Sequence, residues 1–440
     1  MVASLRRRVS GTARRIRLGR VNAPTPSPAR LRVVTRDIAH VDDLLQYGDP
    51  ADPLVWTRGG AWLVGVGRAL TLTAHGAEVA GLAARWREVA AAAQVDDHVG
   101  VPGSGLVAFG ALPFDAESAA TAVLTVPLLT IGHRDGLTWA TWVLPDAGAP
   151  DPEAPQTIGY GPHWSAAVGP GALTPDGYQD AVRQGLAAIS AGEVSKVVLA
   201  RDLVGTVPGH ADLRRLVRSL ASAYPDTWVY AVDGLIGASP ETLVTVSGGQ
   251  VTARVLAGTV ARGANPDADR DAALALATSA KDLAEHGYAV RSLVDALTPH
   301  TTALAAAEQP FTLSLPNVWH LATDVEATTA AGTSALDLVG VLHPTAAVAG
   351  TPTDAAIAAI RRIEPFDRGR YAGPVGWVDG HGDGEWAIAL RGAQFDLAGA
   401  DPDGIRFTAH AGAGIVAGSD PEAEMLETRV KFRPIIDALA

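Results

Sequence analysis

The chain has 440 residues, of which 48% are hydrophobic and 19% are charged, a composition that is typical of a globular protein and excludes a chain that is disordered throughout. It contains no cysteine, so disulfides and thiolate metal sites are excluded, any metal must bind through oxygen or imidazole, and a cytoplasmic location is expected. No apolar run approaches the roughly 18 residues that a membrane-spanning helix needs, so no membrane segment is predicted.

Positive charge is concentrated at the N-terminus. Residues 1–36 hold ten arginines and no acidic residue, whereas the rest of the chain carries 25 basic and 47 acidic residues. Because an acidic body repels nucleic acid, we expect no nucleic-acid partner. Residues 1–36 contain a proline-rich stretch and no apolar segment after the arginines, which favours a flexible extension over a secretory signal. An arm that binds nucleic acid or a membrane is the alternative interpretation.

Strands and helices are expected in separate runs along the chain. Helical spacing of apolar residues predicts helices at 77–93, 174–191, 267–297, 354–363 and from 421 onward. Short apolar runs between glycines and prolines predict strands between 31 and 170, at 194–204, near 228, 243 and 255, and at 376–395 and 404–415. This segregation indicates an α+β fold with mostly antiparallel sheets rather than a doubly wound fold.

Lysine is nearly absent from the chain. Of 35 basic residues, 32 are arginine and three are lysine, namely Lys196, Lys281 and Lys431. Since arginine serves wherever only a positive charge is needed, the lysines are candidates for a task that requires losing a proton near neutral pH. Lys196 is the best candidate because its predicted strand face is otherwise apolar, although a lysine at a sheet edge that points into water fits this residue equally well. Lys281 opens a charged helical turn and is expected to be structural.

Two predicted helices carry acidic residues three positions apart, Asp282 with Glu285 and Glu424 with Glu427. Residues at i and i+3 share a helix face, so two such helices facing each other would gather four carboxylates, which repel one another unless a cation or protons are bound. Mg²⁺ suits such a site because it prefers oxygen ligands. Either pair alone is more commonly a solvated helix face. The histidines show no zinc-motif spacing, so zinc is not expected.

Glycines cluster in residues 412–418. Their spacing differs from that of a dinucleotide-binding loop, and no βαβ unit surrounds them. Because small residues allow backbone N–H groups to approach an anion closely, we interpret Gly412, Ala413 and Gly414 as a turn that could hold a carboxylate.

Eight motifs carry a resemblance to a known family. They are SKVVLAR (195–201), ASPE (238–241), LAGT (256–259), KDLAEH (281–286), LHPT (342–345), YAGPVG (371–376), ALR (389–391) and GAGI (412–415) with 424–431. In this order they resemble the chorismate-utilising enzymes, which include isochorismate, salicylate, anthranilate and aminodeoxychorismate synthases. The resemblance runs from about residue 170 to the C-terminus, and the N-terminal third matches loosely.

The resemblance implies an α+β fold of two large antiparallel sheets packed face to face, with helices outside and one active site. We expect residues 1–36 to be an extension and residues 37–440 to form a single catalytic domain. Within that domain, residues 37–170 would be a variable half and residues 171–440 the half that bears the motifs.

The resemblance also implies a chemistry in which water adds at C2 of chorismate while the C4 hydroxyl leaves. Lys196 would be the general base and Glu241 the general acid, so burial must shift the pKa of each toward neutrality. Glu285 and Glu427 would hold Mg²⁺ directly, with Asp282 and Glu424 acting through water, and no other cofactor is needed. The substrate would contact Gly258, Thr259, His320, Tyr371, Arg391, Gly412, Ala413, Gly414 and Lys431.

Single residues distinguish the members of this family. The amine-transferring members resemble this chain less, because they carry glutamine at position 196 or a nucleophilic lysine at position 257, where this chain has Lys196 and Ala257. Residues 346–348 favour an isochorismate synthase over a salicylate synthase, which would go on to eliminate pyruvate. That salicylate synthase and a catalytically silent chorismate-binding protein are the alternatives. We expect a monomer without a glutaminase subunit, serving menaquinone or siderophore synthesis.

Overall fold

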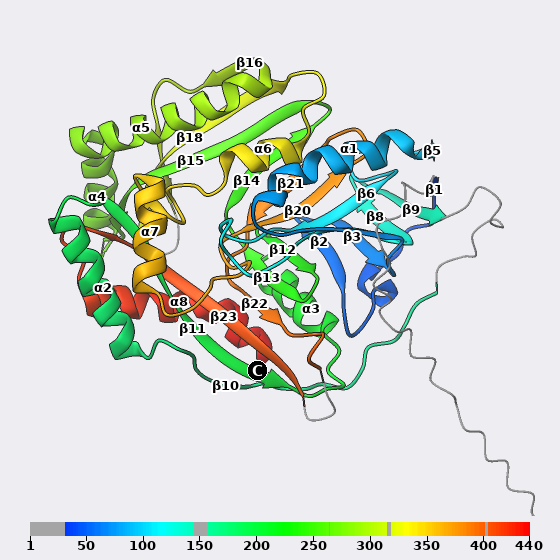
Figure 1. Cartoon of the computed structure of the whole chain (residues 1–440), viewed down its shortest axis with the longest axis horizontal. Coiled ribbons are helices and arrows are strands. Elements are labelled where there is room, and N and C mark those ends of the chain that lie inside the picture. The colour runs from blue at the N-terminus through cyan, green and yellow to red at the C-terminus, as the bar shows by residue number, and fades with distance from the viewer. Residues whose placement is uncertain (1–30, 145–155, 264, 315–317, 401–403) are drawn as a thin grey trace, which may run out of the picture.

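The computed structural model describes residues 31–144, 156–263, 265–314, 318–400 and 404–440, and in these residues the strands form two large sheets. All strand pairs are antiparallel except β1 with β5. Helices lie outside the sheets (Figure 1). The predicted α+β fold of two mostly antiparallel sheets is therefore confirmed.

The first sheet has thirteen strands in the described residues. In spatial order they are β10 (Ala167–Pro170), β11 (Lys196–Val207), β23 (Ile405–Val416), β22 (Gly392–Phe395), β13 (Leu235–Ser239), β12 (Trp228–Val232), β2 (Leu54–Arg58), β3 (Ala61–Val66), β8 (Leu129–Arg134), β9 (Leu137–Leu144), β1 (Arg32–Asp37) and β5 (Gln94–Asp97), with β19 (Gly350–Thr351) beside β11. The longest pairing joins β11 to β23 over twelve residues, from Lys196 opposite Val416 to Val207 opposite Ile405.

The second sheet has ten strands in the described residues. In spatial order they are β16 (Thr301–Ala306), β18 (Val318–Thr329), β15 (Gln250–Ala261), β14 (Thr242–Ser247), β21 (Gly384–Ile388), β20 (Pro374–Asp379), β6 (Val107–Ala111), β7 (Ala122–Val126) and β4 (Leu70–Ala74), with β17 (Phe311–Ser314) beside β18.

The helices are α1 (Leu82–Ala92), α2 (Pro175–Ser190), α3 (Arg214–Ala223), α4 (Pro266–Thr278), α5 (Ala280–Leu297), α6 (Ala335–Leu342), α7 (Thr353–Ile363) and α8 (Pro421–Leu439). The helix predicted at 174–191 is confirmed: the Thr174 side chain accepts the Gly177 N–H at its start, and Gly192, with φ of +74°, follows its end. The single helix predicted at 267–297 is in fact two helices. The chain is extended at Ser279, whose hydroxyl accepts the Asp282 N–H and starts α5.

The two sheets pack face to face through an aromatic core. Trp56 and Trp228 of the first sheet stack with ring centroids 5.0 Å apart, and Phe109 and Trp377 of the second sheet belong to the same buried cluster. Glu385 of β21 links the sheets, because its carboxylate accepts the Trp56 indole N–H at 2.8 Å and an Arg134 N–H at 2.7 Å. The Trp228 indole N–H of the first sheet also donates to the Thr242 hydroxyl of the second at 2.8 Å, so the sheets are joined by apolar burial and by polar contacts.

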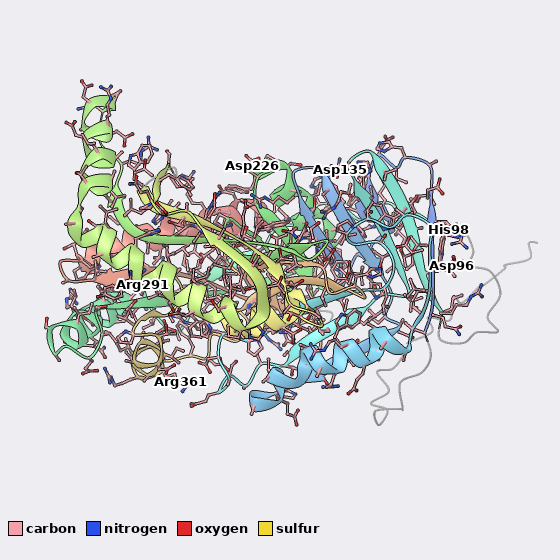
Figure 2. The ribbon with its side chains drawn as sticks, turned by 90° about the horizontal axis from the view of Figure 1, so that it is seen from above. Asp96, His98, Asp135, Asp226, Arg291 and Arg361 are labelled. Carbon is pink, nitrogen blue, oxygen red and sulfur yellow. The ribbon has the colours of Figure 1, made fainter. Side chains whose placement is uncertain are left out.

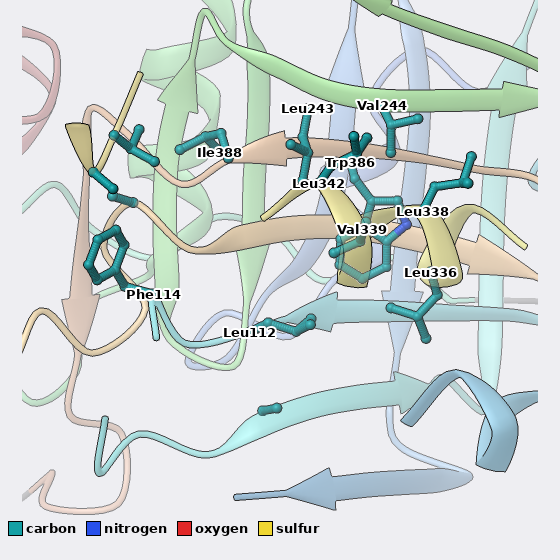
Figure 3. Packing of buried hydrophobic residues seen from close by; sticks show 14 of the residues in the cluster. Leu112, Phe114, Leu243, Val244, Leu336, Leu338, Val339, Leu342, Trp386 and Ile388 are labelled. Atoms are coloured by element: carbon teal, nitrogen blue, oxygen red, sulfur yellow. The ribbon is translucent and has the colours of Figure 1, made fainter. Parts of the chain in front are cut away.

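Helices cover the outer face of the second sheet. Leu336, Leu338, Val339 and Leu342 of α6 pack on Leu243, Val244, Trp386 and Ile388 of β14 and β21 (Figure 3). Viewed from above, Arg291 of α5 and Arg361 of α7 lie at one end of the molecule, and Asp96 and His98, near β5, lie at the other (Figure 2). Helices α5 and α7 therefore lie at one end of the molecule and β5 at the other, whereas β20 and β6 pair side by side in the second sheet.

The predicted N-terminal extension included residues 32–36, and for those residues it is wrong. Arg32–Asp37 form β1, which pairs with β9 on one side and β5 on the other, and Val33 and Val34 are buried. Two successive apolar residues favour a strand here, and the strands on both sides stabilise it. These effects are stronger than the preference of the flanking arginines for solvent. Residues 1–30 lie outside the described part of the chain. None of the described helices is long and apolar enough to cross a membrane.

Candidate active site

The chain crosses from one sheet to the other at two adjacent points. Residues 240–241 lead from β13 in the first sheet to β14 in the second, and residues 389–391 lead from β21 back to β22. The Ile388 N–H donates to the Glu241 carbonyl at 3.1 Å, and the Ala238 N–H donates to the Arg391 carbonyl at 3.2 Å. The crossings therefore hold Glu241 and Arg391 side by side where the sheets part.

Glu241 lies among three cationic side chains. Burial raises the pKa of its carboxyl group, and the charges of Lys196, Lys431 and Arg391 oppose that rise. A carboxyl group in this environment can hold a proton closer to neutral pH than an exposed glutamate. Such a group is suited to act as a general acid.

Lys196 is the first residue of β11. Its neighbours on the same strand face, Val198 and Ala200, are buried as the sequence predicts. A Cβ atom added to Gly414 of β23 would lie 3.1 Å from Lys196 Cε. The glycine therefore leaves the space that the lysine side chain occupies above β23.

Lys431 of α8 contacts the backbone of β23. Its ammonium group donates to the Gly412 carbonyl at 2.9 Å and lies 2.5 Å from a Glu427 carboxylate oxygen one helical turn earlier. The predicted turn at 412–414 is wrong: these residues are part of β23, and Gly412 and Gly414 are paired with Ala200 and Val198. The long register with β11 keeps the segment extended despite its glycines.

The second sheet contributes a bulged strand pair. Gly258 has φ of +80° at a register shift between β15 and β18, a conformation that glycine adopts without strain. His320, opposite Thr259, is hydrogen-bonded to the Gly258 backbone. Burial lowers the pKa of His320, and the charges of Lys196 and Lys431 lower it further, so the ring is neutral at pH 7. These charges show that residues of both sheets share one electrostatic environment.

Acidic residues predicted to bind a metal lie near these residues of the two sheets. Asp282, in the first turn of α5, packs beside Gly258, where an added Cβ atom would lie 3.5 Å from Asp282 Cβ. Burial raises the pKa of Glu424, and the nearby Glu427 carboxylate raises it further. The side chains of Glu285, Thr259 and Lys281 lie outside the described part of the structure. Among the described side chains, no group of three acids or histidines is close enough to hold a metal. The donor set itself, made only of carboxylates, fits a hard divalent cation.

Tyr371 is held in an aromatic stack. The ring centroids of Tyr371 and His410 are 5.0 Å apart, with an interplanar angle of 22°. The ring centroid of Phe366 lies 5.1 Å from that of His410. Burial raises the pKa of Tyr371 to about 12, and burial lowers that of His410 to about 4. Both rings are therefore neutral at pH 7, so Tyr371 can offer a hydroxyl donor to an anion.

A buried ion pair that sequence patterns did not predict supports β11. Arg368 makes two hydrogen bonds to Glu364, at 2.6 and 2.8 Å, and donates to the Val198 carbonyl at 2.7 Å. The Glu364 carboxylate also accepts the Ala200 N–H at 2.7 Å. Because both side chains are about 1% exposed, removing either one would leave a buried charge unpaired. This pair fixes the strand that carries Lys196.

His286, which the sequence places in the same motif as Asp282, is structural. Its ring is buried, with Nδ1 3.0 Å from the Ala257 carbonyl and Nε2 2.7 Å from the Thr323 hydroxyl. Both nitrogens are occupied, so this histidine joins α5 to the second sheet and is not placed to bind a metal.

A groove of about 1010 Å³ lies on the first sheet and is lined in part by Tyr371, His410, Asp202, Val204 and Thr408. A buried carboxyl group with a raised pKa, a lysine beside a strand glycine and several cations lie together as a candidate enzyme site. Residues 163–440 match the family described as chorismate binding enzyme, and the chain belongs to that family. The resemblance predicted from the motifs is thereby confirmed, as is the prediction that the protein is an enzyme.

Several curated relatives carry the same kind of name. The chain is 41% identical to isochorismate synthase DhbC of Bacillus subtilis over 277 residues, which cover 60% of this chain and 68% of the relative. It is 39% identical to the putative isochorismate synthase MenF of Mycobacterium tuberculosis (strain H37Rv) over 351 residues, covering 77% and 87%.

The fold is shared with solved structures. The crystal structure of a putative 2,3-dihydroxybenzoate-specific isochorismate synthase, DhbC from Bacillus anthracis, matches with a TM-score of 0.69 and 30% identity over 90% of this chain and 98% of that chain. The menaquinone-specific isochorismate synthase MenF from Escherichia coli matches with a TM-score of 0.71 at 23% identity, which supports the fold alone.

Proposed function

We propose that this protein is an isochorismate synthase that converts chorismate to isochorismate. The observation that carries the proposal is the pairing of Glu241, a carboxyl group whose pKa is raised by burial, with the nearby amine of Lys196. An acid and a base in one site are what a displacement of hydroxyl by water requires. The names of the relatives support the same reaction.

In the proposed reaction, Lys196 accepts a proton from water as the water oxygen bonds to C2. Both ring double bonds shift, from C1=C2 to C1=C6 and from C5=C6 to C4=C5, the C4–O bond breaks, and Glu241 gives its proton to the departing hydroxyl. One water is consumed and one is released, so the reaction is an isomerisation. Proton exchange then returns Lys196 to the amine and Glu241 to the acid.

The substrate is a dianion and needs cations in an otherwise acidic protein. We propose that Arg391 and Lys431 bind its carboxylates, with a hydroxyl donor from Tyr371 and backbone contacts from residues 412–414 of β23. In the described part of the chain, no side chain forms a hydrogen bond or salt bridge with the Arg391 guanidinium. Its charge is therefore available to a ligand. Gly258, Thr259 and His320 are proposed to line the opposite wall.

Magnesium is proposed as the cofactor. Glu285 and Glu427 would hold Mg²⁺, and Asp282 and Glu424 would contribute through water. When bound, the ion would offset the negative charge of a substrate carboxylate next to these acids.

Incubation with chorismate and Mg²⁺, followed by chromatography of the products, tests the proposed function. We expect isochorismate. Salicylate with pyruvate would indicate the salicylate synthase alternative. The chain is also similar to a relative from Pseudomonas aeruginosa named salicylate biosynthesis isochorismate synthase, to which it is 35% identical over 263 residues. Unchanged chorismate would indicate the silent binding protein and contradict the proposal.

The metal assignment is tested by titrating activity with Mg²⁺ at saturating chorismate. Glu427→Gln removes one proposed ligand charge, so the Mg²⁺ concentration for half-maximal rate should rise at least tenfold. Glu422→Gln, an exposed acid in the first turn of the same helix, should leave it unchanged. An unaltered Mg²⁺ requirement and rate in Glu427→Gln would remove Glu427 from the site.

A further inference from the structure

The backbone of Arg391 adopts a conformation that arginine rarely takes. Its φ is +53°, in the left-handed region, where a residue with a Cβ atom is strained by about 1–2 kcal/mol. The residue stands at the crossing from β21 to β22 and carries the guanidinium proposed to bind substrate. A strained residue keeps one conformation only when its surroundings hold it there.

Two hydrogen bonds hold this segment. The Tyr230 hydroxyl of β12 donates to the Leu390 carbonyl at 2.9 Å. The Ala238 N–H of β13 donates to the Arg391 carbonyl at 3.2 Å. The peptide units on both sides of the Arg391 Cα atom are thus tied to the first sheet.

The Tyr230 side chain reaches this position along a slot over two paired glycines, Gly237 and Gly392. A Cβ atom added to Gly237 would lie 2.4 Å from the Tyr230 hydroxyl oxygen, and one added to Gly392 would lie 2.8 Å from it. Tyr230 is completely buried, and burial raises its pKa above the ordinary value, so the hydroxyl keeps its proton and remains a donor. The slot has room for a tyrosine and directs its hydroxyl to the Leu390 carbonyl.

We propose that Tyr230 is a positioning residue for substrate recognition. Its hydroxyl fixes the peptide before Arg391, which holds the strained backbone and aims the guanidinium at a carboxylate of the substrate. Tyr230 itself touches neither the substrate nor the reacting atoms. This inference rests on the proposed function for the role of Arg391 and adds a residue that acts through it.

Kinetics of Tyr230→Phe with chorismate give the first test. The ring still fills the slot while the hydroxyl is lost, so we expect KM to rise about fivefold, the effect of one net hydrogen bond, with kcat within about twofold. Tyr160→Phe is the control, because it removes a hydroxyl that lies 3.0 Å from Asp43, away from the site. The control should leave both constants unchanged.

A double-mutant cycle separates positioning from a general loss of structure. In an Arg391→Gln background, Tyr230→Phe should raise KM no further, because the group that it positions is gone. An equal rise in KM in both backgrounds, or no rise in the parent, would overturn the proposal.

Crystal structures of the parent and of Tyr230→Phe supply a readout that does not depend on turnover. We expect residue 391 to leave the left-handed region, or its side chain to lose its single orientation, in the variant. If the parent fails to convert chorismate, the proposed function fails, and these structures still decide the inference. An unchanged backbone and guanidinium at residue 391 would overturn it.

Discussion

At the scale of single residues, the functional groups are distinguished by their surroundings more than by their type. Glu241 and Glu427 are both glutamates beside lysines, yet burial raises the pKa of Glu241, whereas the Glu427 side chain is 44% exposed and pairs with Lys431. The first is therefore suited to act as an acid, and the second is an accessible carboxylate in an ion pair. The assignment of roles therefore depends on burial, which follows from the fold.

Replacing Lys196 with arginine tests its role as the base. Arginine keeps the positive charge but cannot lose a proton near pH 7, so kcat should fall at least a thousandfold while KM changes little. Steady-state kinetics at several pH values would show whether any activity returns as pH rises. Near-parent activity in Lys196→Arg would exclude Lys196 from proton transfer.

The scarcity of lysine drew attention to two residues that the structure places near Glu241. Lys196 and Lys431 both act on Glu241 in the structure, although they are more than 200 residues apart in sequence. The conformation of Arg391 and the hydrogen bond from Tyr230 could not be predicted, since both depend on where the chain crosses between sheets. The stack of His410 on Tyr371 has the same origin.

At the scale of secondary structure, sequence patterns predicted most elements but not the effect of pairing. The helix at 174–191 was found because its cap, apolar face and terminal glycine are local signals. Residues 412–414 were misjudged because two glycines suggest a turn, whereas twelve paired residues of β11 hold them extended. The break at Ser279 carried a local signal, a serine three residues before an acid, within a longer helical pattern.

The hairpin between β20 and β21 contains a buried acid that should make stability depend on pH. The Asp379 carboxylate accepts the N–H groups of His381 and Asp383 at 2.8 and 3.0 Å. Burial, with a smaller effect from the neighbouring Asp383, raises its pKa to about 7. Because the folded pKa is above the ordinary value of 3.8, this group stabilises the fold below about pH 4 and loses that contribution as pH rises through 7.

Asp379→Asn keeps an oxygen that can accept both N–H groups but removes the charge. Relative to the parent, the variant should therefore gain stability between pH 5 and 8, by at most about 1.4 kcal/mol per pH unit. Urea unfolding at four pH values in that range would measure the difference. A constant difference across the range would show that Asp379 does not titrate there.

At the scale of the whole molecule, the packing of the two sheets and the proposed site occupy different regions. The sheets pack tightly where the variable half and the middle strands meet, through Trp56, Phe109 and Trp377, and the proposed site lies where the chain crosses between them. The face-to-face arrangement was implied by the motifs and not by periodicity, because alternation along single strands does not say which sheet a strand joins. The hydrogen bonds of Glu385 could not be predicted either, because a single glutamate in a strand carries no pattern that indicates a contact with another sheet.

The first strand gives a test of how the sheet depends on its N-terminal segment. Residues Arg32–Asp37 of β1 pair with all of Trp139–Leu144 in β9, and four of them pair with β5. The Thr35 hydroxyl lies 2.9 Å from that of Thr141 and accepts the Gly105 N–H at 3.2 Å. Removing this strand leaves β5 without its partner and uncovers one edge of β9.

A chain that starts at residue 38 should therefore be strongly destabilised, and one that starts at Leu31 should match the parent. Burial of Val33 and Val34 alone contributes about 1.5–3 kcal/mol each, a large part of the roughly 5–15 kcal/mol by which a domain is stable. Urea unfolding of both truncated proteins measures the effect, and the protein that starts at Leu31 controls for loss of the arginine-rich residues. If the chain that starts at residue 38 unfolds at the same urea concentration as the parent, β1 contributes nothing to the sheet, and the boundary predicted at residue 36 was the right one. If the chain that starts at Leu31 is also destabilised, residues 1–30 contribute to the fold as well.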